Sequence, residues 1–535
     1  MNTPGGQASA SAPQTIALCL VSHTNAGKTT LARTLLRRDI GEVRDAPHVT
    51  EFAEDHLLLR DSAGDELRLW DTPGFGDSVR LARRMRQQGN PIGWFLSAVW
   101  DRWRDRPFWS SQQALRNVRE HADVVLYLVN AAESPQAAGY VASEMALLAW
   151  TGKPVIVLLN QLGMPRPAEA ESAELLAWQR HLQPLARVVR VLPMDAFARC
   201  WVQEVTLMLA VESALDGERA VVMRRLREAW TQARWATFDR AIGALARSVA
   251  RLAAARQPVS AGAGLADAVK RLGHRLGPLF GGTARDDEPS SQAQRALAAG
   301  LDDEVRGGTA ELIALHGIEG RAQGEILSRV ATQFERRERV DEGKAAMLGG
   351  MLSGALAGLK ADVLSGGLTM GGGLLAGGLL GALGGAGLAR GINVIRGGGP
   401  PWVGWSAEAM GPLVESALLR YLAVAHFGRG RGEWAEGEAP MHWRDVVTAA
   451  LAPRQAALQA LWLSRSARLD APDERERLFE ALHPLLRDAA CDVLQALYPD
   501  DWPAVAAPAA AAPVPVAPPA PPAPPVAPAA PAGEG

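Results

Sequence analysis

The distribution of apolar and polar residues predicts buried strands alternating with helices in the N-terminal part of the chain. Nearly unbroken apolar runs occupy residues 15–21 and 154–159, and such runs are typical of strands that helices cover on both faces. Residues 67–70 alternate as a strand does, and the pattern continues to about Ala214. Because strands separated by helices form parallel sheets, we expect a doubly wound α/β domain over residues 14–215.

Helical periodicity replaces this alternation from about Asp216, which predicts helical regions over residues 216–345 and 400–503. The segment between them, residues 346–399, is rich in glycine. Glycine recurs at every fourth position in two rows, at residues 350, 354 and 358 and at residues 373, 377, 381 and 385. Such rows of small residues permit close packing of helices, so we expect a hairpin of glycine-rich helices here.

Three alternatives stay open for this glycine-rich segment. A helix of its 27 uncharged residues, 363 through 389, would be about 40 Å long, more than the roughly 30 Å of a hydrocarbon core, so the hairpin could span a membrane. Each interior glycine costs about 1 kcal/mol relative to alanine in a soluble helix, so a buried soluble hairpin requires close packing. A disordered glycine-rich loop is the third alternative.

Composition narrows the setting without identifying a function. The formal net charge of −2 over 535 residues argues against broad, nonspecific nucleic-acid binding. Three isolated cysteines form no disulfide or metal-binding pattern, so a reducing cytosol is expected. Residues 1–13 lack the basic start and apolar core of a signal peptide. They and the Ala/Pro-rich tail 504–535 are expected to be disordered, because they cannot bury enough apolar surface.

A phosphate-binding motif follows the first predicted strand, with the sequence Ser22-His23-Thr24-Asn25-Ala26-Gly27-Lys28-Thr29-Thr30. A strand, a tight turn and a helix starting at Lys28 would direct backbone N–H groups and a helix N-terminus at one point, where phosphate binds. Lys28 is expected beside the β- and γ-phosphates, and the Thr29 hydroxyl is a candidate ligand of Mg²⁺. Ser22 stands where the pattern has glycine, which restricts the backbone at the start of the loop.

A second motif in the correct order indicates a nucleotide switch. Asp71-Thr72-Pro73-Gly74 follows the strand at residues 67–70. The Asp71 carboxylate is expected to hold Mg²⁺ through water, and the Gly74 N–H to sense the γ-phosphate. Thr50, at the end of the polar loop 41–50, is the candidate for the hydroxyl that completes the Mg²⁺ shell. The alternative for Thr50 is an ordinary position at the start of a strand over residues 50–59.

Residues 23–29 together with 71–76 resemble the TrmE-Era-EngA group of translation-factor-type GTPases. The whole chain is similar to uncharacterised bacterial proteins that join such a domain to a C-terminal domain of unknown function. The resemblance implies a P-loop NTPase fold (a G domain), GTP as ligand and Mg²⁺ as cofactor. In this group an asparagine at the Asn25 position helps bind K⁺, which substitutes for an arginine finger. A hydrophobic residue at the Phe75 position replaces the water-orienting glutamine.

Because Phe75 cannot hydrogen-bond to water, the resemblance implies slow intrinsic hydrolysis, accelerated by K⁺, by a partner or by self-association through the G domain.

The base-reading motif is incomplete, since the chain reads Asn160-Gln161-Leu162-Gly163 where the group has Asn-Lys-x-Asp. Gly163 brings no carboxylate to accept from guanine N1–H and N2–H, so guanine preference is expected to be looser than usual. The last motif of the group would lie near Leu192–Ala196, where the match is poor.

Residues near 80–118 form an insertion after the second motif, in which tryptophan and phenylalanine are interspersed with arginine. The sequence leaves two interpretations open. The insertion is either a lid or partner-binding element that moves with the nucleotide state, since Trp and Arg are common interface anchors, or a helical pair packed on the C-terminal half.

The sequence therefore predicts a GTP-binding and GTP-hydrolysing switch with a helical effector region. The protein is expected in the cytoplasm, and peripheral or integral association with the inner membrane stays open. The alternatives are a dynamin-like nucleotide-gated membrane protein and a non-hydrolysing nucleotide-binding scaffold. No nucleic-acid partner is indicated. The catalytic candidates are Lys28, Thr50 and Gly74. The candidate metal ligands are Thr29, Thr50 and Asp71 for Mg²⁺ and Asn25 for K⁺. The expected nucleotide-binding residues are Ser22, His23, Thr24, Asn25, Ala26, Gly27, Lys28, Thr29, Thr30, Asp71, Gly74, Asn160 and Gln161.

Overall fold

A six-stranded sheet forms the N-terminal part of the protein, in the order β2-β3-β1-β4-β5-β6. The computed structural model describes residues 12–37, 53–87, 105–162, 168–185, 188–195, 200–259, 289–318, 392–395, 402–426, 441–469 and 471–506. The strands are β1 (Thr15–Ser22), β2 (Glu54–Arg60), β3 (Glu66–Asp71), β4 (Val124–Asn130), β5 (Val155–Asn160) and β6 (Val188–Pro193). Neighbouring strands are parallel except for β2, which pairs antiparallel with β3 at one edge.

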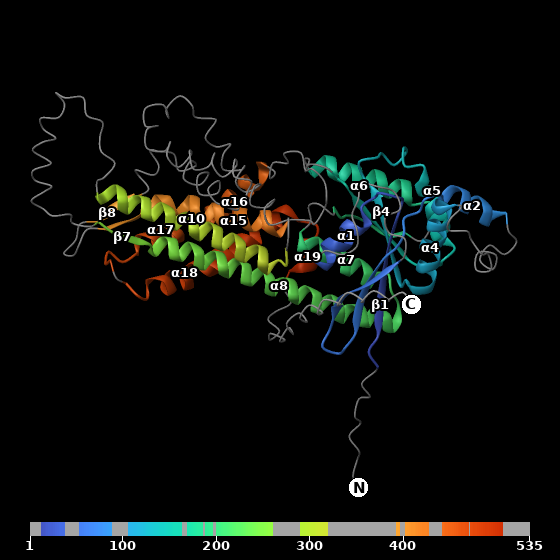
Figure 1. Cartoon of the computed structure of the whole chain (residues 1–535), viewed down its shortest axis with the longest axis horizontal. Coiled ribbons are helices and arrows are strands. Elements are labelled where there is room, and N and C mark those ends of the chain that lie inside the picture. Colours follow the sequence, from blue (N-terminus) through green and yellow to red (C-terminus); the bar gives the residue numbers. More distant parts are fainter. Residues whose placement is uncertain are drawn as a thin grey trace, which may run out of the picture. The chain divides into compact units, whose positions relative to one another are not determined.

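Helices cover both faces of this sheet, so alternate side chains of one strand enter two different cores. The helices are α1 (Lys28–Leu36), α2 (Ser78–Arg86), α4 (Arg106–His121), α5 (Tyr140–Ala149), α6 (Ala168–Leu182) and α7 (Trp201–Ser213). Leu18 and Leu20 of β1 pack in the core that contains side chains of α1 and α7, whereas Cys19 and Val21 pack in the core of α2, α4 and α5. Figure 1 shows these elements around the sheet. The doubly wound α/β domain is thereby confirmed.

The C-terminal part is mainly helical, as predicted. Its helices are α8 (Gly217–Ala254), α10 (Pro289–Leu315), α15 (Ala407–Ala425), α16 (Met441–Leu451), η3 (a 3₁₀ helix, Ala452–Arg454), α17 (Gln455–Leu463), α18 (Glu474–Leu497) and α19 (Trp502–Val505). Helix α8 contacts β1, β2 and β3 as well as α7, α10 and α18, and can be followed in Figure 1. Leu226 of α8 belongs to the same buried cluster as Ile16 of β1 and Leu494 of α18. Sheet and helical bundle therefore share one core.

A small antiparallel sheet, β7-β9-β8, interrupts the helices and was not predicted. It consists of β7 (Arg256–Pro258), β8 (Ile392–Ile395) and β9 (Trp402–Trp405). Strand β8 falls at the end of residues 346–399, for which the sequence predicted a helical hairpin or a disordered loop, so neither expectation holds for residues 392–395. Strands of three or four residues are too short to display a period-two pattern, so the sequence does not predict them.

Several sequence predictions lie outside the described residues. These are Thr50, Gly163, most of the termini 1–13 and 504–535 that were expected to be disordered, and the glycine-rich rows of the predicted hairpin. The expected tail begins inside α19, where Val505 is buried, so disorder is wrong for its first residues. Across the part of the chain that the structure describes, no helix is both long and apolar enough to cross a membrane.

Candidate functional site

The loop between β1 and α1 requires a glycine at its last position. Gly27 adopts a left-handed backbone with φ of 90°, a conformation that other residues avoid. A Cβ atom added there would lie only 2.6 Å from Nδ2 of Asn160. Asn25, at φ of 65°, is also left-handed. No side chain caps the first turn of α1, and that turn carries no acidic residue. Because the first N–H groups of a helix have no intrahelical acceptor, the start of α1 suits an external acceptor such as phosphate.

Lys28 lies almost buried at the start of α1, with 7% of its surface exposed. Its Nζ donates a hydrogen bond to Oγ of Ser22 at 3.1 Å. Burial lowers the pKa of Lys28, and the nearby carboxylates of Asp71 and Glu144 oppose this shift. A Cβ at Gly74 would come within 3.1 Å of the same Nζ, so the ammonium sits between the phosphate loop and the segment that follows Asp71. Ser22 supplies an oxygen acceptor where the usual glycine supplies none.

Asp71 ends β3 and meets the first turn of α1. Oγ1 of Thr29 donates to Oδ2 of Asp71 at 2.6 Å, whereas the buried Oδ1 has no hydrogen-bond partner among the described residues. Burial raises the pKa of Asp71, and the Lys28 charge and the Thr29 hydroxyl counteract that rise. The Thr29 hydroxyl and the Asp71 carboxylate, whose Oδ1 is unpaired, therefore form a set of oxygen donors suited to Mg²⁺.

The segment after Asp71 is hydrogen-bonded to the phosphate loop. Thr24 donates to the main-chain oxygen of Phe75 from its N–H at 3.3 Å and from its hydroxyl at 2.9 Å, and the Phe75 N–H donates to the oxygen of Ser22 at 2.9 Å. The Phe75 ring is completely buried in the core of α2, α4 and α5. Gly74 is thereby held against Thr24 and Lys28, its role as a γ-phosphate sensor stays a prediction, and the Phe75 ring offers no polar group to water.

A buried carboxylate that the sequence analysis did not identify joins this loop to α2 and α5. Glu144 of α5 is 0% exposed. Its Oε1 lies 2.8 Å from Nδ1 of His23, and its Oε2 accepts from the Tyr127 hydroxyl at 2.6 Å. The hydroxyl of Ser78, the first residue of α2, also hydrogen-bonds to it, and burial raises the pKa of Glu144. The His23 ring stacks on Tyr140, with centroids 4.3 Å apart. A sequence signal did exist, because Glu144 is the one charged residue of α5.

Asn160 contacts the phosphate loop directly. Its Nδ2 donates to the main-chain oxygen of Ala26 at 2.8 Å, and the residue is completely buried. Gln161 follows with a left-handed φ of 58°, and the N–H of Leu162 donates to Oδ2 of Asp195 at 3.0 Å. Asn160 thus lies beside the phosphate loop, and the expected contact of Asn160 and Gln161 with the base stays a prediction. The contribution of Asp195 was missed.

The described parts of the insertion near 80–118 pack on the α/β domain itself. Helix α4 contacts β1 and α2. Phe108 of α4 is buried, and the guanidinium groups of Arg80 and Arg84 lie over its ring at 4.5 and 4.8 Å. Residues 88–104, with most of the aromatic residues of the insertion, lie outside the described part. The lid interpretation therefore stays a prediction.

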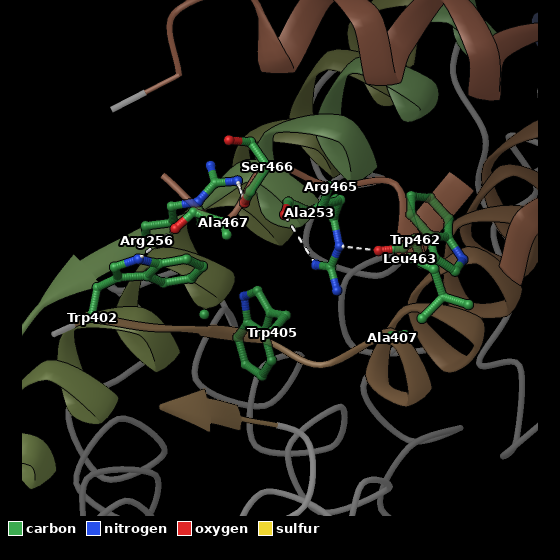
Figure 2. A pocket seen from close by; sticks show the side chains of 12 residues that line it. Ala253, Arg256, Trp402, Trp405, Ala407, Trp462, Leu463, Arg465, Ser466 and Ala467 are labelled. Carbon is green, nitrogen blue, oxygen red and sulfur yellow. Dashed lines mark hydrogen bonds between the residues drawn. The ribbon is translucent and has the colours of Figure 1, made fainter. Parts of the chain in front are cut away.

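A separate cavity of about 190 Å³ lies where α8 and α17 end, and Figure 2 shows its lining. Two arginines face it, but both donate to main-chain oxygens near these helix ends. Arg465 donates to Ala253 at 3.1 Å and to Trp462 at 2.8 Å, and Arg256 donates to Ser466 at 2.7 Å. These arginines satisfy the unpaired carbonyl groups at the helix ends, so their presence is explained by the stability of the fold. None of the residues that line the cavity belongs to the nucleotide site.

A match to a protein family agrees with this geometry. Residues 17–161 match the family model described as 50S ribosome-binding GTPase. Among solved structures, the chain is similar to a variant of Era from Aquifex aeolicus bound to GDP and AlF₄⁻, with 17% identity and a TM-score of 0.29 over 38% of this chain and 58% of that one.

Era in complex with MgGDPNP and nucleotides 1506–1542 of 16S ribosomal RNA is similar at 17% identity and a TM-score of 0.29, over 39% of this chain and 59% of that one. The chain thus spans less than two thirds of the length of each. The search of curated proteins gave no match. Taken with the loop, Lys28 and Asp71, the family match shows that the chain carries a GTP-binding domain of the GTPase type, joined to a mostly helical C-terminal region.

Proposed function

We propose that this protein is a molecular switch that binds and hydrolyses GTP. The observation that supports the proposal most directly is the convergence of Lys28, Thr29 and Asp71 at the uncapped start of α1. A buried ammonium, a pair of oxygen donors and the N-terminus of a helix suit a nucleoside triphosphate with a divalent cation. The position of Gly74 against Lys28 allows that segment to respond to the γ-phosphate.

Mg²⁺ fits the donors that this site presents. Mg²⁺ prefers oxygen ligands and keeps several waters, so a hydroxyl and a carboxylate together with the substrate phosphates suffice. Thr29 would ligate the ion, and the unpaired Oδ1 of Asp71 would hold it through water. When bound, the ion neutralises charge on the β- and γ-phosphate oxygens. Thr50 completes this set in our proposal.

Hydrolysis in this proposal is slow until a cation or a partner assists it. The buried ring of Phe75 orients no water, so the attacking water depends on groups supplied from elsewhere. K⁺ held with the help of Asn25, or a second copy of the G domain, would supply the missing positive charge. Comparing phosphate release in K⁺ and Na⁺ at matched ionic strength tests the first of these.

The helical half is the effector in this proposal, and membrane contact through residues 346–399 is the part supported by sequence alone. Separating soluble and membrane fractions of the expressed protein, with and without GTP, tests that contact. Recovery in the soluble fraction under both conditions would contradict it.

The Lys28→Ala substitution tests nucleotide binding. It removes the ammonium that would face the phosphates and leaves the hydrophobic core unchanged, so we expect GTP affinity to fall by at least about a hundredfold, or roughly 2.8 kcal/mol. Isothermal titration with GTP measures the loss. Lys153→Ala is the control, since Lys153 precedes β5, at the opposite end of that strand from Asn160. Unchanged GTP affinity in a folded Lys28→Ala protein would refute the proposal, and absence of phosphate release by the wild type would favour the non-hydrolysing scaffold.

A further inference from the structure

One buried carboxylate joins two segments of the nucleotide site that are far apart in the sequence. Glu144 of α5, a helix that packs against α2 (Figure 1), is completely buried. Its Oε1 lies 2.8 Å from Nδ1 of His23 in the phosphate loop. The same carboxylate hydrogen-bonds to the hydroxyl of Ser78, the first residue of α2. The phosphate loop and the start of α2 therefore share one hydrogen-bonding partner.

The start of α2 is important because it directly follows the segment that carries Gly74. The N–H of Phe75 donates to the main-chain oxygen of Ser22 in the phosphate loop at 2.9 Å. Three residues later, the Ser78 hydroxyl meets Glu144, which is bonded in turn to the same loop. Both ends of this short segment are therefore held to the loop that would bind phosphate.

Other groups already stabilise the two partners of Glu144 locally. Helix α2 is capped by Asp77, whose side chain accepts from the N–H of Arg80 at 3.1 Å. The His23 ring stacks on Tyr140, with centroids 4.3 Å apart. A buried carboxylate also carries a desolvation cost, so apolar residues of similar volume often stabilise a core as well or better. What Glu144 adds is therefore the position of the phosphate loop relative to α2.

We propose that Glu144 is a positioning residue for GTP hydrolysis, which holds the phosphate loop and the start of α2 in the arrangement that hydrolysis requires. This inference rests on the proposed GTP hydrolysis and adds a residue that lies outside the sequence motifs. Hydrolysis is sensitive to such an arrangement, because a displacement of about 1 Å can slow a reaction about a hundredfold. Binding relies on Lys28, whose Nζ is bonded to Ser22. We therefore expect Glu144 to affect the rate of hydrolysis more than the affinity for GTP.

The Glu144→Gln substitution tests this role in the full chain. It keeps the size of the side chain, but its one oxygen has about two lone pairs where the carboxylate has about four, so the bonds to the loop, to α2 and to β4 cannot all be made to oxygen. Asp71 still supplies a carboxylate near Lys28. We expect the rate constant of hydrolysis at saturating GTP to fall about tenfold or more, and GTP affinity to change less than about threefold. Single-turnover phosphate release and isothermal titration measure the two quantities separately.

A matched pair of hydroxyl deletions separates positioning from stability. Ser78→Ala and Tyr127→Phe each remove one hydroxyl from the same carboxylate, since Tyr127 of β4 donates to Oε2 of Glu144 at 2.6 Å. Only Ser78→Ala releases α2, so it should slow hydrolysis about tenfold, whereas Tyr127→Phe should lose unfolding free energy in urea denaturation and keep the wild-type rate within about twofold. Adding Ser78→Ala to Glu144→Gln should cause no further slowing, because Ser78 acts through Glu144.

Three results would overturn the inference. The first is the wild-type rate of hydrolysis in a folded Glu144→Gln or Ser78→Ala protein, and the latter is decisive even if the former fails to fold. The second is equal slowing by Ser78→Ala and Tyr127→Phe, which would leave Glu144 a structural role only. The third is a loss of GTP affinity as large as the loss of rate. A wild type that binds no GTP or releases no phosphate would instead overturn the proposed function, before any variant is compared.

Discussion

At the scale of single residues, Ser22 explains how the phosphate loop tolerates the loss of a glycine. Its hydroxyl accepts from Lys28 at 3.1 Å and donates to the main-chain oxygen of His23. The ammonium of Lys28 is therefore held by a hydrogen bond within the loop itself. Gly27 is different, because both its backbone conformation and the space around it exclude a side chain.

The Gly27→Ala substitution should separate these two restrictions when it is compared with Gly152→Ala. Both glycines have positive φ, of 90° and 70°, but a Cβ at Gly152 meets nothing within 4 Å whereas one at Gly27 meets Asn160. A left-handed alanine costs about 1–2 kcal/mol. We expect Gly152→Ala to lose about that much unfolding free energy in urea denaturation, and Gly27→Ala to lose more and to bind GTP weakly. Equal losses with normal GTP binding would show that Asn160 yields without consequence.

The sequence alone identified the site residues that lie in continuous motifs. Lys28, Thr29 and Asp71 carry their chemistry in a local pattern, and the structure brings them together as predicted. Glu144 and Asp195 could not be found this way, because each meets the loop only through the order of the strands and helices. A single glutamate in an apolar helix marked the former, and only the poor match of the last motif near Leu192–Ala196 pointed to the latter.

At the scale of elements, the bundle helices α10 and α15 are each followed by a buried histidine. The Nδ1 atoms of His316 and His426 lie 2.8 Å from the main-chain oxygens of Leu312 and Leu422, one turn earlier. Burial lowers the pKa of His316 to about 3 and that of His426 to about 4. Both rings are therefore neutral in the folded protein at physiological pH.

These histidines predict that the protein loses stability in mild acid. The unfolded chain binds protons below the ordinary histidine pKa of about 6.5, whereas the folded protein does not until pH 3–4, so unfolding free energy falls as pH falls through this window. Each histidine contributes about 2 kcal/mol of this loss at pH 5. Urea denaturation at pH 7.5 and pH 5 should show a smaller difference for a His316→Gln, His426→Gln double variant. An unaltered pH dependence would contradict the prediction.

At the scale of the whole molecule, the sequence placed a domain boundary near residue 215, where strands give way to helices. Helical structure does begin there, since α8 starts at Gly217. The hydrophobic core of the sheet, however, continues beyond this point into α8. Val222, Met223 and Leu226 are buried in the cluster that contains Ile16 of β1. Local patterns report which residues form a helix but not which sheet that helix covers.

A fragment that ends at residue 215 should therefore be markedly less stable than one that ends at residue 233. The shorter fragment loses four large apolar side chains of α8 from the core, Trp230 as well as the three just named, a loss on the order of 8 kcal/mol. Thermal melts of both fragments with bound GDP, and their recovery in soluble form, measure the difference. Equal melting temperatures would mean that α8 adds nothing to the α/β domain.

The length of α8 has a mechanical consequence. A helix of 38 residues is about 57 Å long, and its first turns are anchored to the sheet by Arg225, which donates to Asp65 at 3.1 Å. A lever of this length magnifies motion, since a tilt of about 5° at the sheet displaces the other end by about 5 Å. A tilt of α8 at the sheet would therefore move the end of the helix beside the cavity lined by Arg256 and Arg465 by about the width of a side chain.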